Sequence, residues 1–472
     1  MLRPWTIKIQ FEKDSKKAIY LQITDHIIDM IKNGTLKPGD VLPSSRLLAV
    51  EMGINRNTVI KSLNILLSEG WLYSEERKGL FISAKLPILM RHEKRLDVPP
   101  SKTGDQGKNP IIIFDSGLPD TQIAPMRELA SAYRQIFNRK SRINPMLNRS
   151  ELGILRFRES VSRMLNQTRG MHTNHTQVCI TRGSQMALFL IAHAILNEGD
   201  IILVENPGYG PAWETFRHAG AKLVSVAVDE KGIIVEDIKR IVSTQQIKAV
   251  YITPHHQYPT TVILSLERRL QLIELSNRYK FTIIEDDYDC DFHFGVRPIA
   301  PLSSLDGAND TVYIGTFSKM ISESLRIGYL IANEDIIHKV GNLRRIIDLQ
   351  GDNIMEQAIL ELIESGVIRK HIRKASKYYL NKRNFFAALI DKYLSDKVIY
   401  KMPEGGLAFW LKLRNKQDIT KLNQALKLRG INLVHWTNYS FDNEINGIRL
   451  GYASLSENQL EKGIKVLSKV IK

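Results

Sequence analysis

The stretch "GTFSKMISESLRIGYL", residues 315–330, places a lone lysine and an arginine directly after an apolar run. The run that leads into it, "TVYI", is rich in β-branched and aromatic residues and is typical of a buried strand. Lys319 stands among small and hydroxyl-bearing residues, and Arg326 follows seven positions later. A lone lysine after a strand is usually a surface residue whose ammonium group reaches water. The role of Lys319 therefore depends on what the rest of the chain places around it.

Composition indicates a soluble globular protein with more than one domain. The chain has 472 residues, of which 43% are hydrophobic and 25% are charged. Its formal net charge of +16 favours an acidic partner such as nucleic acid. Two cysteines, Cys179 and Cys290, provide neither a disulfide framework nor a CxxC zinc motif. No apolar run approaches the roughly 20 residues of a membrane span, and no signal-peptide core is present, so we expect a cytoplasmic protein.

Strand-like runs alternate with helical stretches from residue 111 onward, and this alternation predicts the fold class of the larger part. The runs are "IILVEN", "KLVSVAV", "KAVYITP", "FTIIEDD" and "TVYIGT". They predict an α/β domain, residues 111–472, with a mostly parallel sheet and helices on both faces. From about residue 390 to residue 472 the pattern of apolar runs changes, and this part of the sequence predicts a smaller α+β lobe. Residues 85–110, rich in Lys, Pro and Gly, predict a linker.

Residues 1–84 have the pattern of three helices followed by a β-hairpin. Isoleucines at helical spacing form the apolar face of the first helix: Ile19, Ile23, Ile27 and Ile31. Ser44 or Ser45 can cap a second helix, which ends before Gly53, and a third runs from about 55 to 69. A short glycine-containing turn between two helices predicts a helix-turn-helix. The segment "WLYSEERKGLFIS" predicts a wing that turns at Lys78 and Gly79.

Polar residues at the start of the third helix predict contacts with DNA. Arg56 can chelate a guanine edge, Asn57 can bind adenine, and Thr58 can bind a phosphate or a methyl group. Phosphate contacts that make binding sensitive to salt are expected from Arg46, Lys61 and Lys78. The alternative from residues alone is a three-helix packing module whose charges are merely solvated.

This part of the chain resembles the GntR-type winged helix. The shared pattern is "LPSSRLLA", then "GINRNTV", then "EG" and a glycine in the wing. The resemblance covers about the first 83 residues and implies a DNA-binding domain. It places four residues at the family's DNA-contacting positions: Arg46, Arg56, Thr58 and Gly79.

In the larger part, groups that bind phosphate and flat rings follow the ends of predicted strands. "TRGSQMAL", residues 181–188, is a turn that opens a helix, where backbone N–H groups and Ser184 can hold a phosphate. Tyr209 in "ENPGYGPAW" can stack on a flat heterocycle, and "IIEDDYD" ends a strand in carboxylates. Thr316 and Ser318 add hydroxyl donors beside Lys319. Because ligands collect at the carboxyl ends of parallel strands, we expect these groups to meet.

Together these groups predict a pyridoxal phosphate site. Asp286 would keep the pyridine nitrogen of the cofactor protonated, so that the ring can act as an electron sink. Tyr288 would donate a hydrogen bond to the phenolic oxygen. Lys319 would form an imine with the cofactor, and Arg326 would bind its phosphate. This is the role that we predict for the lone lysine.

Residues 111–472 resemble the fold-type I aminotransferase domain. The resemblance is carried by "FDSGLPD", "TRGSQMAL", "ENPGY", "TPHHQYPT", "EDDYD", "GTFSK", "LRIGYL", "PEGGLAFWL" and "GIRLGYA". It implies phosphate ligands at Gly183, Ser184, Gln185, Thr316, Ser318 and Arg326. It also implies that Tyr209 stacks on the cofactor ring, that Asp286 and Tyr288 hold its polar edges, and that Lys319 is the Schiff-base lysine. Arg449 would clamp the carboxylate of an amino acid with two parallel hydrogen bonds.

The chain departs from the aminotransferase pattern at two positions. Tyr258 stands where aminotransferases commonly have an asparagine before the proline, which alters the cofactor contact at that position. Glu323 stands where family members often have a proline, which adds a carboxylate near the site.

No metal site is expected. Adjacent His255 and His256 on an extended segment point to opposite faces. The alternating carboxylates Asp287, Asp289 and Asp291 suggest a solvated strand end more than a cation site.

A GntR-type winged helix joined to an aminotransferase-like domain is the architecture of MocR/GabR-family regulators. It implies a transcriptional regulator that senses an amino compound or pyridoxal phosphate through the Lys319 aldimine. It also implies a homodimer with swapped DNA-binding domains. Two alternatives remain open: a working aminotransferase with an accessory DNA-binding domain, and a mere dimerisation scaffold. The retention of Lys319, Asp286 and Arg326 disfavours the scaffold.

Overall fold

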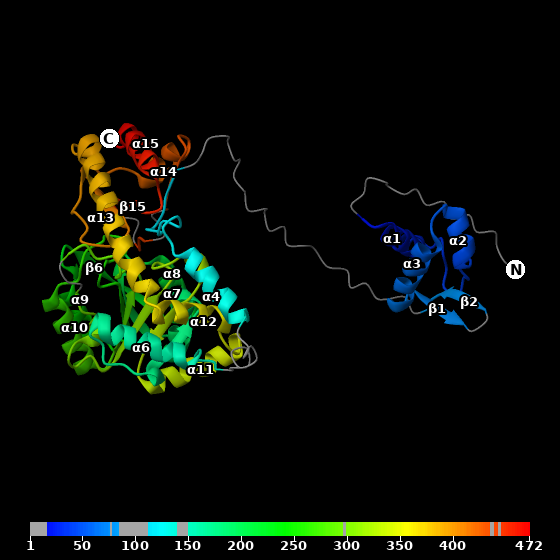
Figure 1. Ribbon diagram of the computed structural model, residues 1–472, viewed down its shortest axis with the longest axis horizontal. Helices are drawn as coiled ribbons and strands as arrows, with labels where there is room; N and C mark the ends of the chain where they lie inside the picture. The colour runs from blue at the N-terminus through cyan, green and yellow to red at the C-terminus, as the bar shows by residue number, and fades with distance from the viewer. Residues whose placement is uncertain are drawn as a thin grey trace. The chain divides into compact units, whose positions relative to one another are not determined.

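The computed structural model describes residues 17–75, 78–84, 112–138, 150–295, 299–434, 439–441 and 445–472. The chain divides into two compact units, Met1–Gly107 and Lys108–Lys472. Each is shown in Figure 1 and is described by itself. The predicted linker, 85–110, lies outside the described residues.

The first unit contains three helices and a two-stranded hairpin. The elements are α1 (Ile19–Lys32), α2 (Ser45–Met52), α3 (Arg56–Ser68), β1 (Leu72–Glu75) and β2 (Gly79–Ile82). β1 and β2 pair antiparallel, with Glu75 opposite Gly79. This arrangement is the predicted winged helix-turn-helix.

Local side chains define the turn of this helix-turn-helix. Ser44 Oγ accepts a hydrogen bond from Leu47 N at 3.3 Å, and α2 ends at Gly53 in the left-handed conformation. Asn55 Oδ1 then accepts from Asn57 N at 2.8 Å and begins α3. Capping of this kind satisfies backbone N–H groups that the helix itself leaves free.

The core of the first unit explains why the three helices pack. Ile23, Ile27 and Leu63 are almost fully buried in one cluster with Trp71. Ile19, the first of the four isoleucines at helical spacing, is 46% exposed. It lies at the first residue of the helix, one turn before the core begins.

The second unit is built on an eight-stranded sheet with the order β4-β11-β10-β9-β8-β5-β6-β7. These strands are β4 (Val178–Thr181), β5 (Ile201–Asn206), β6 (Lys222–Asp229), β7 (Gly232–Ile233), β8 (Ala249–Ile252), β9 (Thr282–Asp287), β10 (Thr311–Thr316) and β11 (Gly328–Ile331). The neighbours from β10 through β9, β8 and β5 to β6 are parallel. β11 runs antiparallel to both β10 and β4. The predicted mostly parallel α/β sheet is confirmed.

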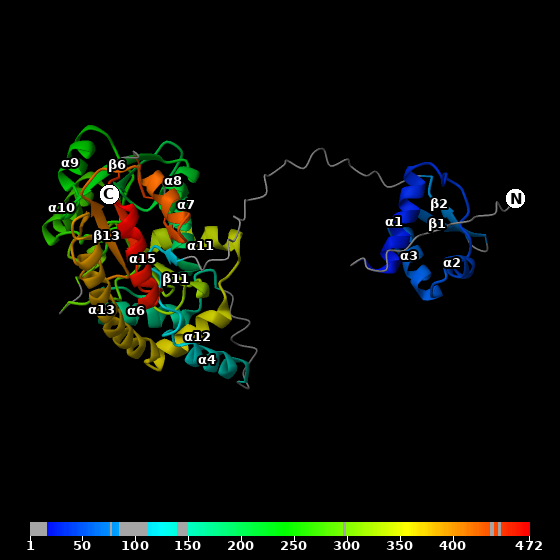
Figure 2. The same cartoon turned by 90° about the horizontal axis from the view of Figure 1, so that it is seen from above.

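Helices cover both faces of this sheet, as the two views show (Figures 1 and 2). On one face pack α7 (Gly183–Ile195), α8 (Gly210–His218) and α11 (Glu334–Ile347). On the other pack α4 (Met126–Asn138), α6 (Leu155–Arg169), α9 (Val235–Thr244), α10 (Leu266–Tyr279) and α12 (Asn353–Glu364). Short 3₁₀ turns are η1 (His175–Gln177), η2 (Leu302–Ser304) and η3 (Glu323–Leu325). Burial on both faces explains the nearly continuous apolar runs of the strands.

Successive residues of a strand face opposite sides, and this decides which side chains reach which helices. In β9, Ile284 packs against the cluster of α7 and α8, whereas Ile283 packs against the cluster of α9 and α10. Asp286, two residues after Ile284, and Asp287, four residues after Ile283, continue this alternation. The adjacent carboxylates of Asp286 and Asp287 therefore lie on opposite faces of the sheet, in different surroundings.

A C-terminal lobe completes the second unit. Its strands are β12 (Val398–Ile399), β13 (Ala408–Leu413) and β15 (Gly447–Gly451) in one sheet, with β14 (Ile431–Leu433) paired parallel to β3 (Ile112–Phe114). Its helices are α14 (Ile419–Lys427), α15 (Glu457–Val470) and part of α13 (Val367–Leu394). Among the described helices, none is long and apolar enough to cross a membrane.

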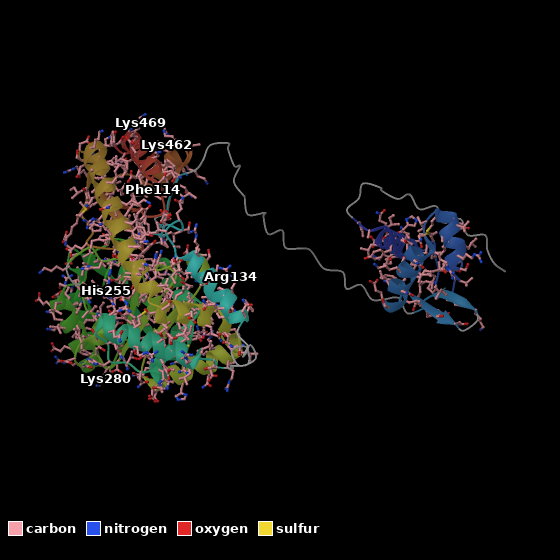
Figure 3. All side chains as sticks on the ribbon, viewed as in Figure 1. Phe114, Arg134, His255, Lys280, Lys462 and Lys469 are labelled. Carbon is pink, nitrogen blue, oxygen red and sulfur yellow. The ribbon has the colours of Figure 1, made fainter. Side chains whose placement is uncertain are left out.

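The C-terminal lobe extends beyond the stretch 390–472 that composition suggested. Phe114 is fully buried in its core, and Figure 3 places that residue within the lobe. Tyr379 of α13 belongs to the same core, whereas Ile368 of the same helix packs in the large lobe. Phe114 and part of α13 thus belong to the C-terminal lobe because of how they pack. The spacing of apolar residues in the sequence does not reveal this packing.

Candidate cofactor site

A cavity of about 120 Å³ lies at the carboxyl ends of the parallel strands. It is lined by Ser116, Ser184, Gln185, Tyr209, Tyr251, Thr253, Tyr258, Asp286, Tyr288, Thr316, Ser318, Lys319, Glu323 and Arg326. All predicted cofactor-binding residues except Gly183 are in this set. The structure therefore brings together predicted side chains that lie as far apart in the sequence as Ser184 and Arg326, which are separated by 142 positions.

Lys319 follows β10 and projects its ammonium group toward the start of the second unit. Its Nζ donates a hydrogen bond to the carbonyl oxygen of Gly117 at 2.7 Å. Burial lowers the pKa of Lys319 from its ordinary value, although Glu323 and two aspartates oppose this effect. A lowered pKa increases the fraction of neutral amine, which is the form that attacks a carbonyl carbon.

Asp286 is a buried carboxylate with one free oxygen. Its Oδ2 accepts a hydrogen bond from the Tyr251 hydroxyl at 2.9 Å, while its Oδ1 is buried and has no partner among the described residues. Burial raises the pKa of Asp286 to about 7. A buried acceptor without a donor is costly unless a ligand supplies one. The protonated ring nitrogen of pyridoxal phosphate is such a donor, so Asp286 fits the cofactor.

The phosphate end of the site lies at the N-terminus of α7. A Cβ atom at Gly183 would lie 2.9 Å from Arg326 Nη2, so only glycine allows the guanidinium to approach the helix this closely. Ser318 Oγ is buried without a hydrogen-bond partner among the described residues, and Thr316 Oγ1 accepts from Ser318 N at 3.1 Å. Free N–H groups, a hydroxyl and a guanidinium together suit a phosphate.

Gln185 differs from the other predicted phosphate ligands. Its Nε2 donates to Thr215 Oγ1 at 2.8 Å and lies 3.4 Å from the carbonyl of Pro211. The side chain is therefore committed to α8, and its backbone N–H in the first turn of α7 is the group left for a phosphate.

Aromatic rings form the wall of the cavity. The rings of Tyr209 and Tyr258 meet edge to face, with centroids 5.2 Å apart. Tyr258 also packs edge to face against Tyr288 at 6.3 Å. Burial raises the pKa of all three phenols, so they stay protonated at neutral pH. The tyrosine that replaces the usual asparagine thus contributes a ring to an aromatic wall.

Arg449 is buried beside the cavity, and each of its three guanidinium nitrogens contacts a protein group. Its Nε donates to the Ser116 carbonyl at 3.1 Å and its Nη1 to the Pro259 carbonyl at 2.9 Å. Its Nη2 contacts the Tyr288 hydroxyl at 3.3 Å, and its guanidinium lies 4.7 Å from the centroid of the Tyr258 ring. Two of its five N–H groups remain for a ligand.

Tyr288 does not have a free hydroxyl in this structure. The hydroxyl donates to the His256 carbonyl at 2.8 Å and accepts from Arg449. To donate to the cofactor, as predicted, it must exchange the bond to His256. The role of Tyr288 stays a prediction.

The carboxylates after β9 are not a solvated strand end, and that interpretation is wrong. Asp287 is buried, forms an ion pair with Arg169 and lies 3.1 Å from His255 Nδ1. Asp289 is buried and accepts from His256 Nδ1 at 2.7 Å. The reason is that α6 and the loop after β8 cover this strand end, where α6 provides the charge of Arg169 and the loop provides two histidine rings as hydrogen-bonding partners. Within the described ranges, no group of three or more metal-binding side chains occurs.

Reasoning from sequence missed four members of the site: Ser116, Gly117, Tyr251 and Thr253. Tyr251 left a signal, because it is a hydroxyl within the apolar run "KAVYITP". Thr253 Oγ1 donates to the buried Glu205 at 2.7 Å and accepts from Tyr258 N at 2.9 Å. Ser116 and Gly117 act through backbone carbonyls, which no residue type reveals.

The predicted DNA-contacting residues lie at the surface of the first unit. Arg56 and Asn57 are exposed at the start of α3, and Arg56 Nε donates to Ser45 Oγ at 3.3 Å. Thr58 is half-buried, and Arg46 is exposed on α2. The exposure of Arg56 and Asn57 at the start of α3 suits the entry of this helix into a groove.

Two of the predicted phosphate-binding lysines have neighbours within the unit. The Lys61 ammonium lies 3.9 Å from the centroid of the Tyr20 ring. Lys78 pairs with Glu75 at 3.1 Å, beside Gly79 with its positive φ of 122° in the wing. Both side chains are exposed, so DNA can compete for them.

Comparison with known families decides the identity of the larger unit. Residues 111–467 match the family described as "Aminotransferase class I and II". The chain belongs to the class I and II aminotransferase family. Residues 19–82 match "Bacterial regulatory proteins, gntR family", so the chain has the MocR/GabR architecture. This family match confirms pyridoxal phosphate as the cofactor of this aminotransferase domain.

Full-length relatives share both parts of the chain. It is 26% identical to "Probable rhizopine catabolism regulatory protein MocR" of Rhizobium meliloti, over 97% of this chain and 94% of that protein. It is 28% identical to "HTH-type pyridoxine biosynthesis transcriptional regulator PdxR" of Corynebacterium glutamicum, over 94% of each chain. The Pyrococcus horikoshii kynurenine aminotransferase, solved in complex with PMP, covers 77% of this chain and 91% of its own, with 26% identity and a TM-score of 0.72.

Proposed function

We propose that this MocR/GabR-family protein is a DNA-binding transcriptional regulator whose aminotransferase domain senses an amino compound or pyridoxal phosphate at Lys319. One observation supports the proposal: a single chain combines the exposed, polar start of α3 with a cavity that gathers nearly all of the predicted cofactor-binding residues. A metabolic enzyme has no use for the first feature, and a simple repressor has no use for the second. The names of the MocR and PdxR relatives support the same reading.

Pyridoxal phosphate supplies a carbonyl carbon that binds amines reversibly and a ring that withdraws electrons. Around it, Lys319 would offer the amine, Asp286 would hold the proton of the ring nitrogen, and the aromatic wall of Tyr209 and Tyr258 would limit access of water. Arg326 and the first turn of α7 would hold the phosphate. The two free N–H groups of Arg449 would orient a carboxylate of the effector.

The effector can change DNA binding only through a difference in its affinity for two states of the protein. Both Lys319 and Arg449 hold contacts that span the two lobes of the second unit. An effector that engages these two side chains competes with those contacts. We therefore propose that the effector acts by changing how closely the two lobes approach each other. We also propose that the protein binds two half-sites as a domain-swapped homodimer.

Two measurements test the proposal on the full chain. Pyridoxal phosphate added to the protein should produce a visible absorption band, and Lys319→Ala should abolish this band while the fold persists. A colourless wild type would end the sensor hypothesis. Steady conversion of a common amino acid would favour the alternative, an active aminotransferase, which the lowered pKa of Lys319 also supports.

The DNA-binding function is tested by Arg56→Ala. Specific binding to a duplex selected with the wild type should weaken by about 1–3 kcal/mol, the value of one good bidentate base contact. Lys462→Ala removes one positive charge from the exposed surface of α15 and should leave binding unchanged (Figure 3). Equal affinities of both variants would contradict the assignment of α3 as the reading helix.

A further inference from the structure

The segment 115–120, which directly follows β3, is anchored to the C-terminal lobe at its first residue. The Asp115 side chain accepts from Ser454 Oγ at 2.5 Å, and its carbonyl accepts from Gly451 N at 2.9 Å. A Cβ atom at Gly451 would lie 2.2 Å from Asp115 Oδ1, so the segment and β15 are in close contact. This end of the segment is therefore held against β15.

The last residue of the segment is anchored to the same lobe. Asp120 is buried and accepts from Tyr378 Oη at 2.8 Å. Lys382 Nζ lies 3.4 Å from the same carboxylate and donates to the Ala453 carbonyl at 2.6 Å. Asp120 N donates to Tyr379 Oη at 2.9 Å. Both ends of the segment thus belong to the C-terminal lobe.

Between these anchors, Asp115 shapes a turn that aims two carbonyl groups at the cofactor site. Its Oδ1 accepts from both Gly117 N and Leu118 N at 2.7 Å. Gly117 has a φ of 98°, which favours glycine. The Ser116 carbonyl then meets Arg449 Nε, and the Gly117 carbonyl meets Lys319 Nζ at 2.7 Å.

The bond between Lys319 and Gly117 joins the two lobes, because Lys319 follows β10 of the large sheet. It uses the nitrogen that must react. When that nitrogen forms a double bond to the aldehyde carbon, the aldehyde oxygen leaves as water and the nitrogen keeps at most one proton. Lys319 then no longer has an ammonium group to donate to Gly117.

We propose that the Lys319–Gly117 hydrogen bond is a latch that reports the state of Lys319 to the segment 115–120, with Asp115 and Asp120 as positioning residues. The proposal rests on the proposed cofactor chemistry at Lys319. The segment directly follows β3, the first described strand of the second unit.

Other contacts between the lobes do not involve Lys319. Arg449 Nη1 of β15 donates to the Pro259 carbonyl at 2.9 Å, and Gly208 N donates to the Tyr439 carbonyl at 3.0 Å. Release of the latch is thus expected to loosen the segment without separating the lobes.

The test compares two variants that cannot bind the cofactor covalently. Lys319→Arg keeps N–H donors within reach of the Gly117 carbonyl, whereas Lys319→Met has none. Amide hydrogen exchange of the full-length protein, followed in peptides that cover residues 112–120 and 447–455, is measured without and with pyridoxal phosphate. Circular dichroism checks that both variants are folded.

Without cofactor, we expect slow exchange in wild type and Lys319→Arg. Exchange should be about two- to tenfold faster in Lys319→Met, the effect of one net hydrogen bond. Pyridoxal phosphate should bring wild type to the rate of Lys319→Met and leave both variants unchanged. Equal rates in the two cofactor-free variants, or a wild-type segment that slows with cofactor, would overturn the latch.

A second pair of variants tests the anchors without touching Lys319. Tyr378→Phe removes the hydroxyl donor to Asp120, and Tyr400→Phe removes a matched donor to Asp391, also at 2.8 Å in the same lobe. Only Tyr378→Phe should accelerate exchange in residues 115–120. If both variants behave as wild type, the segment is not held as proposed. Failure of wild type to bind pyridoxal phosphate would instead refute the proposed function, while the cofactor-free comparison still decides the latch.

Discussion

At the scale of single residues, the buried carboxyl group of Asp286 makes the stability of the second unit depend on pH. Burial raises the pKa of Asp286 to about 7 from its ordinary 3.8. Between pH 3.8 and about pH 7, Asp286 of the cofactor-free folded protein therefore holds a proton that the same residue of the unfolded chain has already released. Stability conferred by this group must fall as pH rises through that window, and it is constant above it.

Asp286→Asn should remove this pH dependence. Between pH 5 and pH 7, the stability of the cofactor-free wild type should fall relative to the variant by about 1 kcal/mol per pH unit. Thermal unfolding at the two pH values measures the difference. Asp396→Asn, at an exposed position, serves as the control and should follow wild type. Parallel curves for wild type and Asp286→Asn would contradict the raised pKa.

At the scale of elements, the phosphate end of the site depends on how closely α7 approaches Arg326. Gly183 has a φ of 77°, and any side chain there would collide with the Arg326 guanidinium. Gly199, just beyond the C-terminal end of α7, has a similar φ of 86° but open space around it. The two glycines separate backbone strain from the steric effect on the site.

Gly183→Ala should weaken the binding of pyridoxal phosphate by at least about tenfold, because a displaced guanidinium loses a charge-assisted contact. Gly199→Ala should cost similar stability through its backbone and leave binding unchanged. Titration of the visible absorption band measures both. Equal loss of affinity in the two variants would show that strain, and not the approach of Arg326, is responsible.

Elements also show what periodicity can predict. The runs from "IILVEN" to "TVYIGT" formed strands, because burial on both faces makes parallel strands uniformly apolar. The order of the strands, and the reversal of β11 between β4 and β10, are long-range pairings that no local pattern encodes.

At the scale of the whole molecule, the two units have separate hydrophobic cores. Leu63 is buried in the core of the first unit and Leu467 in that of the C-terminal lobe. A truncation to alanine in such a core typically costs about 2–5 kcal/mol. The two positions therefore allow each unit to be destabilised by itself.

Leu63→Ala should lower the temperature at which specific DNA binding is lost and leave the loss of the cofactor absorption band unchanged. Leu467→Ala should lower the melting temperature recorded by the absorption band. Thermal scans with both signals on each variant provide the comparison. Coincident shifts of the two signals in either variant would show that the units unfold as one.

Residue types and their spacing were sufficient for the winged helix, the α/β class and most side chains of the cofactor cavity. Each of these depends on local chemistry: a cap before a helix, a polar group after a strand, a glycine where a helix begins. Packing alone decided that Asp287 is buried against Arg169, that Phe114 belongs to the C-terminal lobe, and that the Gly117 carbonyl meets Lys319. These contacts join residues far apart in the chain, and they form because burying apolar surface brings whole elements together, which no short stretch of sequence specifies.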